Sequence, residues 1–393
     1  MNFTGVPLSV LFFSLAKRVS VLIMDGKKSI IHLFSELIMK NAVAALMCVI
    51  FICFSCGQWK VSTMKSSEVA TIQAGREPGR ILLKYDDNGM LELSFVITMH
   101  GGKIYFADNI QKRIQILDRD GSVNLILGSR GIESDSDILF SSFNFSTIGY
   151  LAIDSEEQIY VQNKLVSRRG LPESNQNAEL DFTPSFILVF NSKGDLQYTL
   201  GQAGVPNIPF YYIKRMTVDN EDRLFVVSRT FNSWDVSRFK DRKRDFYIDL
   251  GRIRFKESEE GESFEGRIED IIPYAGGEAF IIAVAYYSNT RFKYRKLFEF
   301  SIRKNKIHKT ILNTPDPKNE LFAVIDDKHI YLWDMRDRNI RYAICNFDGN
   351  VINNIMLKRD ERKNLFSDAL IDENGQFYTY HVYRGKITIC EWK

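Results

Sequence analysis

The chain has 393 residues, of which 13% are aromatic and 26% charged, and this composition excludes a disordered or fibrous protein. Residues 1–55 contain five of the 52 basic and two of the 49 acidic side chains, which leaves 47 of each sign in the rest. This neutral balance argues against a nucleic-acid-binding domain, which would carry a basic excess. Nine prolines and no low-complexity tract favour one large repeat-built domain.

The N-terminus has the pattern of an export signal. Met39 and Lys40 form a short positive start, and the thirteen residues from Ala42 to Phe54 carry no charge. This run is too short to span a bilayer and suits the apolar core of a signal peptide. Ser55-Cys56 at its end resembles a bacterial lipobox, which implies lipidation at Cys56. The alternatives are an uncleaved anchor or soluble secretion.

This signal implies a division of the chain. We expect translation to begin at Met39, so that residues 1–38 are an over-extended N-terminus and residues 39–55 are the signal peptide. Residues 56–79, which include the polar stretch Gly57–Glu68, are expected to be a tether. Residues 80–393 are expected to form the folded domain.

Six copies of one unit follow, each with a strand that ends near Asp, a polar turn, and a strand with an aliphatic-aromatic pair. Asp, Asn, Glu and Gly in the turns suit tight connections between antiparallel strands. The spacing of about 47 to 65 residues suits a propeller blade of four strands. The pairs are Ile104-Tyr105, Ile159-Tyr160, Leu224-Phe225, Ala279-Phe280, Ile330-Tyr331 and Phe377-Tyr378.

The third and fourth strands of the copies complete an all-β fold, a six-bladed propeller. Third strands are expected within Arg113–Gly121, Phe186–Gly194, Arg341–Gly349 and Lys386–Lys393, and fourth strands at Val123–Leu127, Leu196–Leu200 and Val351–Leu357. The last copy stops before its fourth strand, so we expect Arg80–Tyr85 to complete that blade and close the ring. The competing fold is a sandwich of alternating strands.

The first copy resembles an NHL repeat, and the residues that carry this resemblance are Ile104, Tyr105, Asp108, Arg113, Ile114 and Gly121. The fifth copy keeps the aspartate as Asp334, whereas the others have Asn163, Ser228, Ala283 and His381 at that point. From Arg80 onward the chain resembles six-bladed propeller lipoproteins of diderm bacteria, of the spirochaetal type. The resemblance implies a lipid-anchored protein of the cell envelope, at the inner or outer membrane.

No cofactor or metal site is expected. Of the four histidines after the signal, His100, His308, His329 and His381, none pairs at metal-ligand spacing. Asp154, Asp219, Asp326 and Asp372 recur at one framework position, where capping of the repeated turn is a better interpretation than a calcium ring. Cys345 and Cys390 align with each other and with Leu117, at positions too far apart for a disulfide, so both are expected to remain thiols.

Three consecutive copies have long segments between their second and third strands: Lys164–Ser185, Arg229–Phe246 and Tyr286–Lys296. Neighbouring long loops would leave one face and form a single wall. Arginine with aromatic residues is typical of recognition sites, although a solvated charged rim with Asp235, Asp241 and Asp245 is an equal alternative. The residues of this expected wall are Arg168, Arg169, Arg229, Trp234, Arg238, Arg242, Lys243, Arg291, Lys293, Tyr294 and Arg295.

These observations favour a non-enzymatic lipoprotein that binds an envelope protein or an anionic glycan through the loop wall. The alternative is a metal-dependent hydrolase or a lactonase-like enzyme that uses the central pocket. Nucleic acid is not an expected partner, because the balance of charge is neutral.

Overall fold

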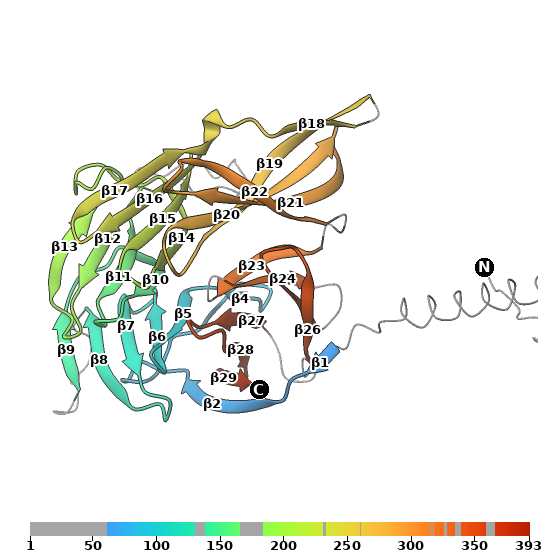
Figure 1. Ribbon diagram of the computed structural model, residues 1–393. Helices are drawn as coiled ribbons and strands as arrows, with labels where there is room; N and C mark the ends of the chain where they lie inside the picture. The colour runs from blue at the N-terminus through green and yellow to red at the C-terminus, as the bar shows by residue number, and fades with distance from the viewer. Residues whose placement is uncertain are drawn as a thin grey trace, which may run out of the picture. The chain divides into compact units, whose positions relative to one another are not determined.

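The computed structural model describes residues 61–129, 138–165, 184–230, 233–259, 261–314, 316, 318–325, 328–334, 339–358 and 366–393. The proposed signal at 39–55 and the lipidation residue Cys56 lie outside them. The described residues form six antiparallel sheets of four or five strands, arranged around a centre as a six-bladed β-propeller (Figure 1). This arrangement confirms the predicted fold. No helix among the described residues is long and apolar enough to cross a bilayer.

Blades 1 to 3 follow the chain from the inner strand outward. A fifth strand, β9, lies parallel to β8 at the outer edge of blade 1. The strands are β5 (Phe95–His100), β6 (Lys103–Asp108), β7 (Arg113–Leu117), β8 (Val123–Gly128) and β9 (Leu139–Ser142) in blade 1, β10 (Thr147–Ile153), β11 (Ile159–Lys164), β12 (Ser185–Phe190) and β13 (Leu196–Leu200) in blade 2, and β14 (Tyr212–Val218), β15 (Leu224–Arg229), β16 (Trp234–Lys240) and β17 (Lys243–Asp249) in blade 3.

Blades 4 to 6 keep this order, with additions at the sheet edges. A 3-10 helix, η1 (Leu250–Arg252), leads into blade 4, and a small hairpin of β3 (Lys84–Tyr85) and β4 (Leu91–Glu92) precedes blade 1. The strands are β18 (Lys256–Glu259), β19 (Glu262–Pro273), β20 (Ala279–Ser288), β21 (Arg291–Ser301) and β22 (Lys306–Thr314) in blade 4, β23 (Glu320–Ile325), β24 (His329–Asp334), β25 (Ile340–Cys345) and β26 (Val351–Leu357) in blade 5, and β27 (Phe366–Ile371), β28 (Phe377–Tyr383) and β29 (Lys386–Trp392) in blade 6.

The repeated apolar pair has a simple structural reason. Successive residues of a strand point to opposite faces of the sheet, so each second strand supplies one residue to each neighbouring blade interface. Ile104 packs in the core between blades 6 and 1, and Tyr105 packs in the core between blades 1 and 2. In blade 4 the residues in these two places are Phe280 and Ile281, so the predicted pair there was wrong by one residue.

The N-terminal strand that closes the ring is not the predicted one. β2 (Ser66–Gln73) pairs antiparallel with β29 and completes blade 6, whereas Arg80–Tyr85 contributes an isolated bridge from Ile81 to Ala74 and the first strand of the small hairpin. β1 (Val61–Thr63) pairs parallel with β26 at the outer edge of blade 5. The domain therefore begins near residue 60. Much of the expected tether, residues 56–79, is part of the propeller.

Candidate functional site

The described residues of the predicted wall do not form one loop surface. Its middle segment, Arg229–Phe246, has only Thr230–Ser233 between β15 and β16 and continues as strands β16 and β17. Its third segment is a tight hairpin, since only Asn289 and Thr290 separate β20 from β21. Charged side chains that alternate along paired strands were mistaken for loop residues. Arg168 and Arg169, from the first segment, lie outside the described residues.

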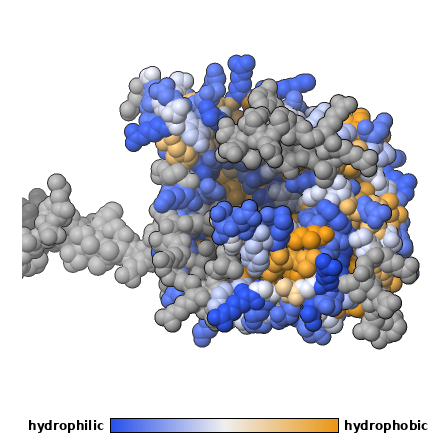
Figure 2. All heavy atoms as spheres, turned by 180° about the vertical axis from the view of Figure 1, so that it is seen from behind, coloured by the Kyte–Doolittle hydropathy of each residue, from blue (hydrophilic) through white to orange (hydrophobic). Residues whose placement is uncertain are grey.

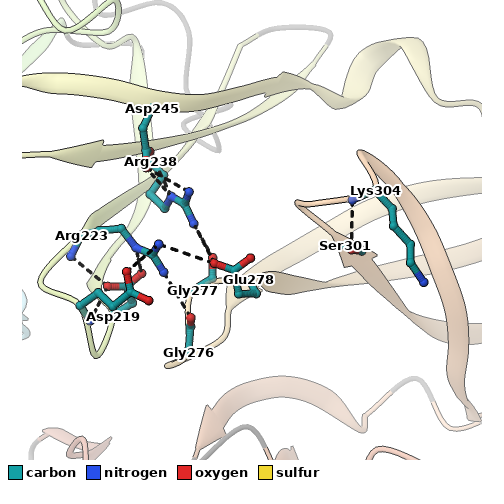
Figure 3. A network of polar contacts seen from close by, with 10 residues as sticks. Asp219, Arg223, Arg238, Asp245, Gly276, Gly277, Glu278, Ser301 and Lys304 are labelled. Atoms are coloured by element: carbon teal, nitrogen blue, oxygen red, sulfur yellow. Dashed lines mark hydrogen bonds and ion pairs between the residues drawn. The ribbon is translucent and has the colours of Figure 1, made fainter.

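Arg238 belongs to a buried polar network that joins blade 3 to blade 4 (Figure 3). Its guanidinium group is within 3.0 Å of the Asp245 carboxylate and donates to the Gly277 carbonyl at 2.7 Å. Arg223 pairs with Asp219 at 2.7 Å and donates to the Gly276 carbonyl. Both arginines are less than 10% exposed, so they hold the Tyr274–Glu278 turn of blade 4 rather than face a ligand.

The other predicted binding residues occupy separate places. Arg242 and Lys243 line a pocket at the turn between β16 and β17, where Arg242 lies over the Tyr198 ring. Lys293, Tyr294 and Arg295 lie on β21 and contact Glu262, Glu257 and Glu269, respectively. Arg291, also on β21, is exposed. Arg295 is only 2% exposed, so its role is structural.

Arg229 and Trp234, by contrast, line a groove between blades 3 and 4. This basic groove has a volume of about 410 Å³. Arg229 ends β15, and its guanidinium carbon lies 5.4 Å from the centre of the Trp234 ring, at the start of β16. Trp234 is 7% exposed and forms the floor of the groove together with Leu250 and Phe255.

The other cations of the basic groove come from the entry into blade 4. Arg254 precedes β18, Lys256 starts β18, and Arg267 lies on β19, where its guanidinium carbon is 5.3 Å from the Tyr287 ring centre. None of these three, nor Arg229, forms an ion pair among the described residues. Glu265 is the one carboxylate among the residues that line the groove.

The basic groove therefore carries an excess of three positive charges on an apolar floor. Arg223, Arg238 and Arg295 elsewhere in blades 3 and 4 all have carboxylate partners, so the unpaired state of the groove cations is a local feature. Arginine offers several donors in a planar fork that suits carboxylate and phosphate groups. Sequence analysis missed Arg254, Lys256 and Arg267, although the alternation of Arg252, Arg254 and Lys256 with Ile253 and Phe255 indicates an edge strand.

A second cavity, of about 400 Å³, lies on the propeller axis and is lined by the inner strands of all six blades. Arg215 of β14 pairs there with Asp270 of β19 at 2.8 Å. At the inner turns, His100 Nδ1 lies 3.5 Å from Glu373, and the Gly101 N–H donates to Glu373 at 3.0 Å. The cavity thus has mostly apolar side chains and internally neutralised ion pairs.

The recurring aspartates cap their turns, as predicted. One carboxylate oxygen of Asp154 accepts from the main-chain N–H groups of Glu156 and Gln158, and Asp219 and Asp372 make the equivalent pairs of bonds. Asp326 lies outside the described residues. In the part of the chain that the structure describes, no three His, Cys, Asp or Glu side chains are grouped to hold a metal ion.

Cys345 and Cys390 are not joined by a disulfide in the part of the chain that the structure describes. The prediction that the two cysteines occupy equivalent positions was wrong. Cys345 pairs with Ile330 in blade 5, and the equivalent residue of blade 6, Phe377, pairs with Trp392 rather than with Cys390. Burial raises the pKa of Cys345 to about 11. This thiol is therefore an inert core residue.

No protein-family model matches the sequence, and no curated protein matches it. Three solved structures with a similar fold are the Dos1 propeller, a gluconolactonase from Xanthomonas campestris and a protein of unknown function from Bacteroides caccae. Their identities to this chain are 10%, 10% and 13%, and their TM-scores are 0.39, 0.42 and 0.35. The matches cover 79%, 84% and 69% of this chain, and 81%, 100% and 87% of the other. The likeness extends to the fold alone.

Proposed function

We propose that this chain is an exported, lipid-anchored propeller that binds an anionic partner in the cell envelope through the basic groove. The observation that supports the proposal is the set of four cations, Arg229, Arg254, Lys256 and Arg267, which line one groove and have no ion-pair partner among the described residues. A rigid ring with a cationic groove is suited to recognition, and it needs no catalytic group. A protein or a glycan of the envelope would supply the negative charge.

Photo-crosslinking in cells tests this proposal. A photoreactive residue at Glu265, the exposed acidic residue of the groove, is expected to capture a partner. Reversal of two groove charges, Arg254→Glu with Arg267→Glu, should abolish the capture. The matched control is Arg303→Glu with Lys306→Glu, which makes the same change of charge at exposed positions elsewhere in blade 4. Capture that survives the groove reversal, or is lost equally in the control, would refute the proposal.

The proposed export and membrane anchoring rest on the N-terminal signal and on the lipobox-like Ser55-Cys56. A lipoprotein's acyl chains would hold the chain at a membrane, at about 0.8 kcal/mol per buried methylene. Cells grown with radiolabelled palmitate should label the protein, and Cys56→Ser should abolish the label. Cys53→Ser is the control, because this cysteine lies within the apolar run of the signal. Label that persists in Cys56→Ser would contradict anchoring at this residue.

A further inference from the structure

We infer that the occupant of the basic groove is an extended acidic polypeptide segment, which adds as a strand to the free edge of β18. This inference rests on the proposed function and names the class of partner. It depends on three features of blade 4: an unpaired strand edge, the side-chain order along that edge, and the shortage of hydrogen-bond acceptors in the groove.

The first feature is the edge itself. The sheet of blade 4 has the order β18-β19-β20-β21-β22, so β18 pairs with β19 on one side and with no other described strand. Lys256 pairs with Glu265, and the Gly266 N–H donates to the Phe255 carbonyl at 2.7 Å. In this antiparallel register the main-chain groups of Lys256 and Ser258 point to the free edge. An extended peptide can pair with such an edge.

The second feature is how side chains alternate beside this edge. Arg254 and Lys256 lie on the groove side together with Arg267. Of the intervening residues, Phe255 lies in the core between blades 3 and 4, where it packs against Phe298 beneath the groove, and Glu257 is paired with Lys296. An added strand would place every second side chain beside the groove cations. A peptide in which acidic residues alternate with apolar ones would place its acidic side chains beside the groove cations and its apolar side chains on the opposite side of the added strand.

The third feature, the small number of side-chain hydrogen-bond acceptors in the groove, favours a peptide over an acidic glycan as the ligand. The cations of the groove are donors only, and Glu265 is the one carboxylate acceptor in its lining. The Ser233 hydroxyl is already bonded to Asp249. A glycan would bring many hydroxyl donors that need acceptors, and the Trp234 ring, 7% exposed, offers no open face for a sugar to stack on. The acceptors that remain are the main-chain carbonyls along the free edge of β18, and their spacing matches the main-chain donors of an extended peptide.

Fluorescence anisotropy of the full chain in detergent, with a labelled peptide of alternating Glu and Val, tests the inference. We expect binding that weakens with added salt and falls roughly tenfold or more in Arg254→Glu/Arg267→Glu, because charge-assisted hydrogen bonds are lost. Ser258→Pro should also weaken binding, since proline removes an edge N–H that β19 does not use. Its thermal unfolding should match that of the unchanged chain. Arg303→Glu/Lys306→Glu should bind normally.

The outcomes separate the inference from the proposed function. Peptide binding that depends on the groove charges but not on Ser258 would overturn strand addition. Charge-dependent binding of a polygalacturonate oligosaccharide, without binding of the peptide, would overturn the peptide and leave the proposed function intact. If neither anion binds, or if groove reversal changes nothing, the proposed function itself fails.

Discussion

Arginines in blades 3 and 4 show how the same side chain serves two purposes. Arg223 and Arg238 are buried beside Asp219 and Asp245 and donate to main-chain carbonyls, whereas Arg254 is exposed in the basic groove and has no carboxylate partner among the described residues. Burial of a guanidinium group is tolerated only with such partners, because an unpaired buried charge costs several kcal/mol. Local partners, rather than residue type, therefore decide which arginines can bind a ligand.

The turn over the two buried arginines requires glycine at one position. Gly277 has φ +71°, and a Cβ atom there would lie 1.9 Å from an Asp219 carboxylate oxygen and 2.2 Å from the Arg223 guanidinium. We expect Gly277→Ala to lower the free energy of unfolding by about 3 kcal/mol, because it combines strain with loss of the network. Chemical denaturation measures this change.

Gly121→Ala is the matched control for this substitution. Gly121 has φ +85°, but no atom lies within 4 Å of the added Cβ. Only the backbone penalty of about 1 kcal/mol should then appear. Equal losses in the two variants would show that the close approach at Gly277 does not matter.

At the scale of elements, a pH-dependent contact joins the inner turns of blades 1 and 6. The hydrogen bond to Glu373 raises the pKa of His100. Burial acts to raise the pKa of Glu373, but bonds from His100 and Gly101 lower it to about 2. The contribution of His100 to stability is present below pH 6.5 and is lost as the pH rises through its raised folded-state pKa. The contribution of Glu373 is present above pH 4.5 and is lost as the pH falls towards 2.

This contact predicts extra stability between about pH 4.5 and 6.5. The carboxylate is 39% exposed, so solvent screening limits the effect to roughly 1 kcal/mol. We expect His100→Gln to remove the difference in unfolding free energy between pH 5.5 and pH 8. Denaturant titrations at both values measure it, with His308→Gln, an exposed histidine on β22, as control. An unchanged pH profile in His100→Gln would show that the contact does not stabilise the ring.

The closing strand β2 gives the second prediction at this scale. Ile72 is 1% exposed in the core between blades 6 and 1, so Ile72→Ala should cost about 2 to 4 kcal/mol of unfolding free energy. Ser67→Ala, at an exposed position of the same strand, should cost little. A chain that starts at Arg80 should not unfold cooperatively, whereas one that starts at Val61 should. Cooperative unfolding of the shorter chain would contradict closure by β2.

The elements that sequence analysis found and missed differ in burial. Second and third strands were predictable because they are buried on both faces, as the unbroken burial of β6 and β7 beyond Lys103 shows. β2 was missed because its outer position leaves only Ala70 and Ile72 buried in a polar stretch. β16 was missed because Asp235 and Arg238 are buried polar residues whose partners, Asp245, Tyr247 and Gly277, lie 7 to 39 positions away in the chain. Such pairings leave no local pattern.

The face drawn in Figure 2 is mostly hydrophilic, with hydrophobic side chains exposed in patches between the hydrophilic ones. Beneath that surface, six apolar cores lie between adjacent blades. Blades 5 and 6 are the two that contain N-terminal strands, β1 and β2. The N-terminal segment thus joins two blades, and closure of the ring depends on strand pairing rather than on a covalent link.

If strand pairing alone closes the ring, the position of the chain ends should not matter. Lys65 and Lys393 exchange two main-chain hydrogen bonds, of 2.8 and 2.9 Å, so a two-residue Asn-Gly turn could join them. New ends between Ser192 and Lys193 would lie in the exposed turn before β13, and blade 2 would then be closed by pairing of β13 with β12. We expect this circular permutant to unfold cooperatively, with a free energy within about 2 kcal/mol of the unpermuted chain from Lys65. Denaturation of both chains, followed by tryptophan fluorescence, measures the difference. A permutant that loses cooperative unfolding would show that closure at blade 6 has a role in folding that another blade cannot replace.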